Sequence, residues 1–350
     1  MSKFVAVILA GGKGQRFWPL STTDRPKQFL DLTQCGRTLI QATFDRILPL
    51  TGGPEAILVA TASEYESLVR EQLPELSQDN LLIEPVGRDS APAIALTSLE
   101  LRHRYGGVTV GFFPSDHSIS QPNEFRRTVH NAINLAEKKD ALITIGIDPT
   151  RPATGYGYIK KGLPYGPGFK VTGFFEKPDR HNAEDYLATG CYTWNSGIFV
   201  WPVDTILKEL DRHVPDLMNP LKQAFDQQRV AEVFPALKKI SIDHAVMEHT
   251  NKAYVIPGEF GWDDVGDWLA LERLIGQGNP EGNTVLGHHI GFETSRSIIY
   301  SENPDDVIVT LGVNDLVVIK RGNAVLVMSK DNAQDIKAIL DDVLVAQLLK

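Results

Sequence analysis

The chain has few of the residues that build disulfide-stapled or zinc-stabilised folds. Its 350 residues include two cysteines, Cys35 and Cys191, which stand far apart and without a cluster of histidines. Neither a disulfide framework nor a zinc site is therefore indicated, and two isolated thiols fit a reducing compartment. A chain of this length buries about three quarters of its unfolded surface, so burial alone can stabilise one large domain or two unequal ones.

Long apolar runs and an excess of positive charge are also missing. No apolar stretch approaches the roughly 18 residues of a membrane span, and the first residues, MSKFVAVILAGG, run straight into a glycine turn, unlike a signal peptide. We therefore expect a cytoplasmic protein with no membrane partner. The formal net charge is -9, from 35 Lys and Arg against 44 Asp and Glu. Because nucleic-acid binders concentrate Lys and Arg, no nucleic-acid partner is expected.

Apolar runs alternate with helical periodicity through the first 150 residues. The strand-like runs are FVAVILA, AILVA, LLIEP, VTVGFFPSD and ALITIGI. Between them, helical periodicity covers Thr38–Leu48, Ser63–Leu73, Ala91–Tyr105 and Pro122–Lys138. The alternation predicts an α/β fold with a mostly parallel sheet covered on both faces. Ligands of such sheets lie outside the carboxyl ends of the strands.

The pattern changes after about residue 150. The runs TGYGYIKKG, FKVTGFFEKP and WNSGIFVWPV look like strands, and an amphipathic stretch follows at Ser241–Thr250. The turn cluster GQGNPEGN at 276–283 is the best domain boundary, so we expect a catalytic domain at 1–280 and a small β-rich domain at 281–350. The tail predicts a terminal helix, whose apolar stripe is Ile336, Ile339, Leu340, Val343 and Leu344.

The end of the first strand carries the most informative segment, LAGGKGQRFWPLSTTDRPKQF, from Leu9 to Phe29. A strand followed by GGKG can present backbone N–H groups to phosphate, although a plain tight turn explains the glycines equally well. The Walker A and dinucleotide motifs both fail, because their later glycine or lysine falls on Arg16 or Phe17. Arg16 and Lys27 instead place two cations near the strand end, which suits a triphosphate.

This segment resembles the signature loop of the sugar-phosphate nucleotidyltransferases, and most closely that of their guanylyl branch, which acts on mannose 1-phosphate. Similar segments follow in order from Glu84 to Trp268, and the tail after residue 281 is also similar, so the resemblance covers essentially the whole chain. It implies a Rossmann-like nucleotidyltransferase domain with a mixed sheet and a short left-handed β-helix-like domain. Phe17 stands where the family more often has Leu.

The resemblance places the nucleotide at the signature loop and at EPVGRDSAPAIAL. Alone, the second segment could be a helix cap built on Asp89 or Ser90. The guanylyl branch usually reads RNTAPAI there, so both residues are departures. The implied nucleotide-binding residues are Leu9, Ala10, Gly11, Gly12, Gly14, Arg16, Lys27, Glu84, Pro85, Arg88, Ser90 and Ala91.

Two acidic segments are candidates for a metal site. FFPSDHSI places Asp116 and His117 after a buried strand, where a carboxylate could cap a helix or hold a hard cation. FGWDDVGDW alone would be an acidic helix start. The resemblance makes Asp116 and Asp264 ligands of Mg²⁺ and gives no catalytic role to His117. Asp263 replaces a common Ser, and it could cap a helix or affect metal affinity.

The sugar phosphate is expected at TGYGYI, FFEKP and WNSGIF. By themselves these segments show a bulge-prone strand, a solvated charge pair and an amide that could bind a hydroxyl. The resemblance implies that Glu176 and the main chain of Gly157 bind the sugar, that Lys177 binds its phosphate, and that Asn195 contacts a hydroxyl.

The implied reaction is attack of mannose 1-phosphate on the α-phosphorus of GTP, which gives GDP-mannose and pyrophosphate. Arg16, Lys27 and Lys177 are the expected catalytic residues, because positioning and fixed positive charge are what phosphate chemistry requires. No general base is needed, since a phosphate monoester is already ionised at neutral pH.

Alternatives remain open. The enzyme could use another nucleotide or glucose 1-phosphate, or the chain could be a catalytically silent nucleotide-sugar-binding subunit. A homodimer is expected by resemblance. Relatives with a phosphomannose isomerase activity extend well past this length, so guanylyltransferase activity alone is expected.

Overall fold

The computed structural model describes residues 3–12, 14–276 and 280–340. The chain forms two compact units. The first comprises Met1–Gly11, Thr43–Ser115 and Ile119–Trp262, and the second comprises Gly12–Ala42, Asp116–Ser118 and Asp263–Lys350. Most of the signature loop therefore belongs to the same unit as the C-terminal segment. The two units are not two consecutive stretches of the sequence, because each is built from three separate segments. The domain boundary at about residue 280 stays a prediction.

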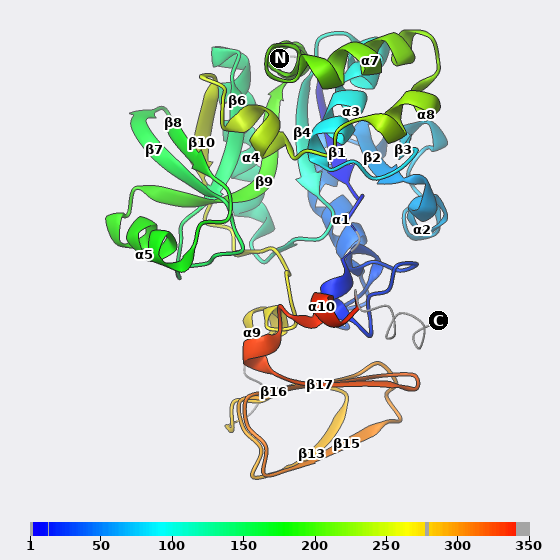
Figure 1. Ribbon diagram of the computed structural model, residues 1–350, viewed down its shortest axis with the longest axis vertical. Coiled ribbons are helices and arrows are strands. Elements are labelled where there is room, and N and C mark those ends of the chain that lie inside the picture. The colour runs from blue at the N-terminus through cyan, green and yellow to red at the C-terminus, as the bar shows by residue number, and fades with distance from the viewer. Residues whose placement is uncertain (1–2, 13, 277–279, 341–350) are drawn as a thin grey trace. The chain divides into compact units, whose positions relative to one another are not determined.

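A nine-stranded sheet forms the centre of the first unit, in the order β3-β2-β1-β4-β9-β6-β10-β8-β7 (Figure 1). Its strands are β1 Phe4–Leu9, β2 Ile57–Ala62, β3 Leu81–Glu84, β4 Thr109–Pro114, β6 Leu142–Ile147, β7 Tyr158–Tyr165, β8 Gly168–Phe175, β9 Tyr192–Pro202 and β10 Ala253–Pro257. β1 pairs in parallel with β2 and β4, whereas β8 and β9 run against the other strands. The expected mixed α/β sheet is confirmed.

Helices occupy the connections between these strands. They are α1 Leu39–Thr51, α2 Glu66–Gln72, α3 Ser90–Tyr105, α4 Pro122–Lys139, α5 Arg180–Thr189, α6 Val203–His213, α7 Pro215–Asp226 and α8 Val230–Val233. The strand β1 is almost wholly buried, with Val5, Val7 and Ile8 at 0% exposure. A strand buried on both faces reads as an unbroken apolar run, which is why FVAVILA was recognisable. The four predicted helices are confirmed, although Ser63–Leu73 divides into a 3-10 turn, Ser63–Tyr65, and α2.

The amphipathic stretch at 241–250 takes an unexpected form. It contains a π-helical turn at Asp243–Met247, with Ala245, Val246 and Met247 buried. Apolar periodicity alone cannot distinguish this winding from an α-helix, because both bury one face.

The second unit contains the expected β-rich tail. A four-stranded sheet holds β12 Thr284–Leu286, β14 Ile298–Ser301, β16 Leu316–Arg321 and β17 Ala324–Ser329, and a second sheet pairs β13 His288–Phe292 with β15 Val307–Leu311. Figure 1 shows β16 and β17 along one side of this segment and β13 and β15 along another. β12, β14 and β16 pair in parallel, as do β13 and β15, so successive turns of chain stack in the manner of a short β-helix.

Short elements complete this unit. They are α9 Ala270–Ile275, α10 Ile336–Leu340 and the 3-10 turns Gln15–Phe17, Lys27–Phe29 and Lys330–Asn332, whereas the two-residue strands β5 Ser118–Ile119 and β11 Trp262–Asp263 each have one residue in each unit. The terminal helix is confirmed over α10, whereas Val343 and Leu344 of its predicted stripe lie outside the described residues. Across the described part of the chain, every helix is too short or too polar to cross a membrane.

The signature loop supplies part of the second unit's hydrophobic core. Phe17 and Leu20 are buried with Trp268, Ile298 and Val317 in one cluster. The ring centroids of Phe17 and Trp268 lie 5.1 Å apart. Phe17, the departure from the family's more common Leu, is therefore a core residue that fills space against an indole.

Candidate active site

The glycines of the signature loop have one clear steric purpose. Gly14 adopts a φ of +48°, and a Cβ there would lie 2.7 Å from the backbone nitrogen of Lys27. The side chain of Gln28, which is buried, donates from Nε2 to the carbonyl of Gly12 at 2.9 Å. Only glycine fits at position 14 without displacing Lys27, so the two ends of the loop are brought together.

Lys27 contacts both predicted metal ligands, Asp116 through its carboxylate and Asp264 through its backbone carbonyl. Its Nζ is 3.0 Å from Oδ2 of Asp116 and donates to the carbonyl oxygens of Asp264 and Val265, at 3.0 and 2.9 Å. Burial alone would raise the pKa of Asp116, but the charge of Lys27, with a contribution from His117, lowers it below the ordinary value. Asp116 is thus held as a carboxylate. His117 supports that charge, with its Nε2 3.9 Å from Oδ1 of Asp116.

The two neighbouring acids Asp263 and Asp264 make different contacts. Asp263 accepts a hydrogen bond from the backbone of Val265 at 2.8 Å and forms an ion pair with Arg273. The carboxylate of Asp264 lies over Gly266, where a Cβ would come within 2.6 Å of Oδ2. The extra acid is therefore engaged by an arginine of its own, and the alternative that it caps a helix is wrong, because the next helix, α9, begins only at Ala270.

Two residues from later in the chain, neither of them predicted as a site residue, hold the signature loop by hydrogen bonds to its backbone. Trp268 donates from Nε1 to the carbonyl of Trp18 at 3.1 Å. Arg321, on β16, donates from one guanidinium nitrogen to the carbonyls of Pro19 and Leu20, at 2.9 and 2.8 Å. Arg321 lies some 300 residues away along the chain, so no local pattern could connect it with the loop.

In the first unit, the predicted nucleotide-binding residues gather where β1 and β3 end. Leu9 is the last residue of β1, and the backbone N–H of Ala10 donates to the carbonyl of Ala60 at 2.8 Å. A Cβ on Gly11 would lie 3.8 Å from Oε1 of Glu84. Glu84 is buried, and burial raises its pKa to about 7.

The segment that follows β3 is held by several hydrogen bonds. Asp89, with φ of +72°, caps α3 and accepts from the backbone of Ser90 at 2.8 Å. The hydroxyl of Ser90 accepts from the backbone of Ile242 at 2.8 Å, and the backbone of Ala91 donates to the carbonyl of Ile240 at 3.1 Å. Both departures from the guanylyl pattern thus have structural partners.

Arg88 adds a polar atom that the fold leaves available. Its Nε is buried without a hydrogen-bond partner among the described residues. Buried donors are usually paired, and an orphan guanidinium nitrogen at a strand's carboxyl end fits an anionic or carbonyl-bearing ligand.

The predicted sugar-phosphate residues also lie together in the first unit. The backbone N–H of Asn195 donates to the carbonyl of Gly157 at 2.8 Å. A Cβ on Gly157 would lie 2.6 Å from Oε2 of Glu176 and 3.5 Å from Cβ of Asn195. Lys177 follows with φ of +45°, and its Nζ is 2.7 Å from Oε1 of Glu176. The Lys177 side chain is 62% exposed, so its ammonium is accessible to a phosphate.

Asp243 completes this cluster and was not predicted. Asn195 donates from Nδ2 to Oδ1 of Asp243 at 3.0 Å. Burial, followed by the negative charge of Glu176, raises the pKa of Asp243 to about 7. The only sequence signal was its place in the amphipathic stretch at 241–250.

The donor chemistry of Asp116 and Asp264 fits a Mg²⁺ ion. Within residues 3–12, 14–276 and 280–340, no group of three or more His, Cys, Asp or Glu side chains is arranged to hold a metal ion. Asp116 and Asp264 offer carboxylate oxygens, which Mg²⁺ prefers, and this ion usually keeps waters and takes phosphate oxygens as its remaining ligands.

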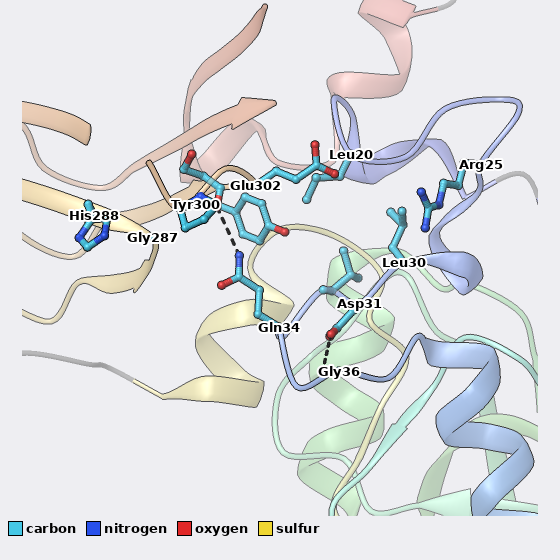
Figure 2. Close-up of a pocket in the computed structure, with 13 residues that line it drawn as sticks. Leu20, Arg25, Leu30, Asp31, Gln34, Gly36, Gly287, His288, Tyr300 and Glu302 are labelled. Carbon is cyan, nitrogen blue, oxygen red and sulfur yellow. Dashed lines mark hydrogen bonds between the residues drawn. The ribbon is translucent and has the colours of Figure 1, made fainter. Parts of the chain in front are cut away.

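A separate cavity of about 660 Å³ lies in the second unit (Figure 2). Arg25, Asp31 and Glu302 give it charges of both signs. Gln34, at its wall, donates to the carbonyl of Ser301 at 3.3 Å. No predicted site residue lines it. It is therefore distinct from the candidate active site.

Comparison with known proteins identifies the class. A family model described as "Nucleotidyl transferase" matches residues 5–277, and one described as "MannoseP isomerase/GMP-like beta-helix domain" matches residues 287–343. The chain therefore belongs to the nucleotidyl transferase family, and the resemblance of its signature loop is confirmed.

Within this family the chain is similar to mannose-1-phosphate guanylyltransferases. It is 37% identical over 359 residues to the "Mannose-1-phosphate guanylyltransferase" of Escherichia coli (strain K12), which covers 98% of this chain and 74% of that relative. The chain thus spans about three quarters of the length of this relative.

Solved structures give the same fold. A Thermus thermophilus protein described as a mannose-1-phosphate geranyltransferase has a TM-score of 0.89 and 37% identity, over 97% of this chain and 98% of its own. A mannose-6-phosphate isomerase from Helicobacter pylori has a TM-score of 0.62 and 25% identity, over 75% of this chain and 99% of its own.

Proposed function

We propose that the chain transfers GMP from GTP to α-D-mannose 1-phosphate and releases GDP-mannose and pyrophosphate. The observation that carries the proposal is the position of Lys27, whose ammonium joins the signature loop to Asp116 and to the Asp264 segment. The 37% identity to the E. coli guanylyltransferase supports the choice of GTP and mannose 1-phosphate.

The reaction forms one P–O bond and breaks another. A phosphate oxygen of mannose 1-phosphate attacks the α-phosphorus of GTP, and the bond from the α-phosphorus to the bridging oxygen breaks as pyrophosphate leaves. Arg16, which is exposed, and Lys27 hold the triphosphate, and Lys177 orients the sugar phosphate. Fixed positive charge lowers the barrier because two anions must meet.

Asp116 and Asp264 would hold Mg²⁺, which supplies positive charge to the phosphate oxygens. The nucleotide contacts Leu9 to Gly12, Gly14, Glu84, Pro85, Arg88, Ser90 and Ala91, and the sugar contacts Gly157, Glu176 and Asn195. No residue acts as general base, since the attacking oxygen already carries charge.

The proposal is tested by measuring pyrophosphate release from GTP, ATP, UTP, dTTP and CTP, each with mannose 1-phosphate and glucose 1-phosphate. GTP with mannose 1-phosphate should have the highest kcat/KM. A silent nucleotide-sugar-binding subunit would bind GDP-mannose and release no pyrophosphate with any pair. Because the H. pylori neighbour is described as a mannose-6-phosphate isomerase, fructose 6-phosphate formation from mannose 6-phosphate is measured in parallel; we expect none.

The same proposal includes a cytoplasmic homodimer. Cys35 and Cys191 are free, exposed thiols, as suits a reducing compartment. In the second unit, one face of the β13/β15 sheet exposes five large apolar side chains by 57–70%: Ile290, Phe292, Val307, Val309 and Leu311. These five residues form the β13/β15 face. None of the five side chains is charged, so a second copy of the chain is the occupant that fits a two-fold contact.

A further inference from the structure

Asp243 has no part in the proposed reaction, although it lies against residues that do. It begins the π-helical turn Asp243–Met247, and π-helical turns are rare and concentrate at functional sites. Its Oδ1 accepts the hydrogen bond from Nδ2 of Asn195 at 3.0 Å. The winding of the chain therefore directs this carboxyl group at the sugar-phosphate cluster.

The amide of Asn195 is fixed in one orientation by its other contacts. Its Oδ1 accepts from the hydroxyl of Thr144 at 3.2 Å and from the backbone of Gly197 at 3.1 Å. The Nδ2 group is thereby left to face Asp243. A fixed amide beside a carboxyl group makes a rigid polar surface, which is what the recognition of hydroxyl groups requires.

The carboxyl group of Asp243 is costly for the fold. Burial and the nearby charge of Glu176 raise its pKa to about 7, so ionising it at neutral pH costs folding free energy. An asparagine would have nearly the same shape and could still accept from Asn195. Stability alone therefore gives no reason for an acid at this position, and a ligand does.

The segment that carries Asp243 also contacts the nucleotide-binding residues. The backbone of Ile242 donates to the hydroxyl of Ser90 at 2.8 Å, and the carbonyl of Ile240 accepts from Ala91 at 3.1 Å. Four consecutive residues, 240–243, thus connect the start of α3 with Asn195. Asp243 is partly exposed, so a ligand between the two clusters can reach it.

We propose that Asp243 binds a ring hydroxyl of the hexose 1-phosphate, beside Glu176 and Asn195. The inference rests on the proposed function, which supplies the sugar-phosphate site. Each ring hydroxyl can donate one hydrogen bond and accept others. The carboxyl groups of Asp243 and Glu176 and the amide of Asn195, held in fixed positions, can form hydrogen bonds with two neighbouring ring hydroxyls. Such a set can select one hexose over its epimers.

The test is Asp243→Asn, which keeps the shape and the Asn195 contact. Because a hydrogen bond to a charged group contributes about 1.5–3 kcal/mol, the KM for mannose 1-phosphate should rise about 10-fold or more, while the KM for GTP stays within about 2-fold. The thermal midpoint at pH 8 should be equal to or higher than that of the wild-type enzyme. His244→Gln, in the same turn but exposed, is the matched control and should change neither KM.

A series of deoxymannose 1-phosphates identifies the contact. For the analogue that lacks the hydroxyl bound by Asp243, wild-type enzyme and Asp243→Asn should have the same KM. For each of the other analogues, the variant should still have a higher KM than the wild-type enzyme. An unchanged KM for mannose 1-phosphate in the variant contradicts the inference. So does a lowered thermal midpoint with equal rises in both KM values, which indicates a structural role.

The two proposals fail in different ways. Wild-type enzyme that releases no pyrophosphate with any hexose 1-phosphate contradicts the proposed function. Active wild-type enzyme with an unaffected Asp243→Asn variant contradicts only the role of Asp243.

Discussion

The Nζ of Lys27 lies 3.0 Å from Oδ2 of Asp116 and donates to the carbonyl of Asp264. One ammonium group therefore joins three segments of the second unit that are far apart in sequence. Asp116, which is partly buried, stays ionised because this cation is beside it. We propose two roles for this lysine: it pairs with the carboxylate of Asp116 and holds the backbone of Asp264, and it binds the triphosphate.

Lys27→Met should lower kcat with GTP and mannose 1-phosphate by about 100-fold or more, because it removes a fixed charge from the reacting phosphates. Pyrophosphate release measures the loss. Lys252→Met is the matched control, since Lys252 also pairs with a carboxylate, Asp140, at 2.8 Å, but outside the predicted site. A Lys27→Met variant within about threefold of wild-type activity would show that the assignment is wrong.

Arg321→Met should loosen the signature loop. It removes two hydrogen bonds to the carbonyls of Pro19 and Leu20, so we expect a lower thermal midpoint and a loss of about 1–3 kcal/mol of unfolding free energy. The KM for GTP should rise several-fold as the loop loses its position. Arg296→Met removes an exposed arginine that pairs with Asp315 in the same unit and should leave KM unchanged. Equal effects of the two substitutions would contradict a role for Arg321 in positioning the loop.

Glu84 makes stability depend on pH. Its pKa is about 7 in the fold, against 4.5 as the ordinary value. Between these values the folded chain binds more protons than the unfolded chain, so this group's contribution to stability falls as pH rises from 4.5 to 7 and is constant above.

Glu84→Gln removes that dependence. In urea titrations the variant should gain about 1–3 kcal/mol at pH 8 and little at pH 4.5. Glu259→Gln, at an exposed carboxylate, should show no gain at either pH. A gain from Glu84→Gln that does not vary with pH would rule out the raised pKa as its cause.

The β13/β15 face should mediate the dimer. Val309→Lys places charge in its middle and should convert a dimer to a monomer in light scattering after size exclusion, because an unpaired buried charge is costly. Val327→Lys is the control, since Val327 on β17 is similarly exposed, 60% against 66%, and lies outside this face. Wild-type protein with a monomer mass, or two variants that both stay dimeric, would contradict this interface.

The strands and the main helices could be predicted, and the segments of the candidate site proposed, because their signals are local. β1 is an unbroken apolar run, and the signature loop has a long, specific pattern. The role of Phe17 could not be predicted, since it depends on Trp268, which is distant in sequence. Asp243 was missed for a related reason: a π-helical turn has the apolar periodicity of an ordinary helix, and the partner of Asp243 is on β9.

The attack on the α-phosphorus of GTP is tested most directly with mannose 1-phosphate that carries ¹⁸O in its three terminal phosphate oxygens. The wild-type enzyme is incubated with GTP and the labelled mannose 1-phosphate, and the masses of both products are measured by mass spectrometry. Our account predicts that GDP-mannose retains all of the label, one labelled oxygen forming the new bridge, and that pyrophosphate has none. Label in pyrophosphate, or no GDP-mannose at all, would contradict it.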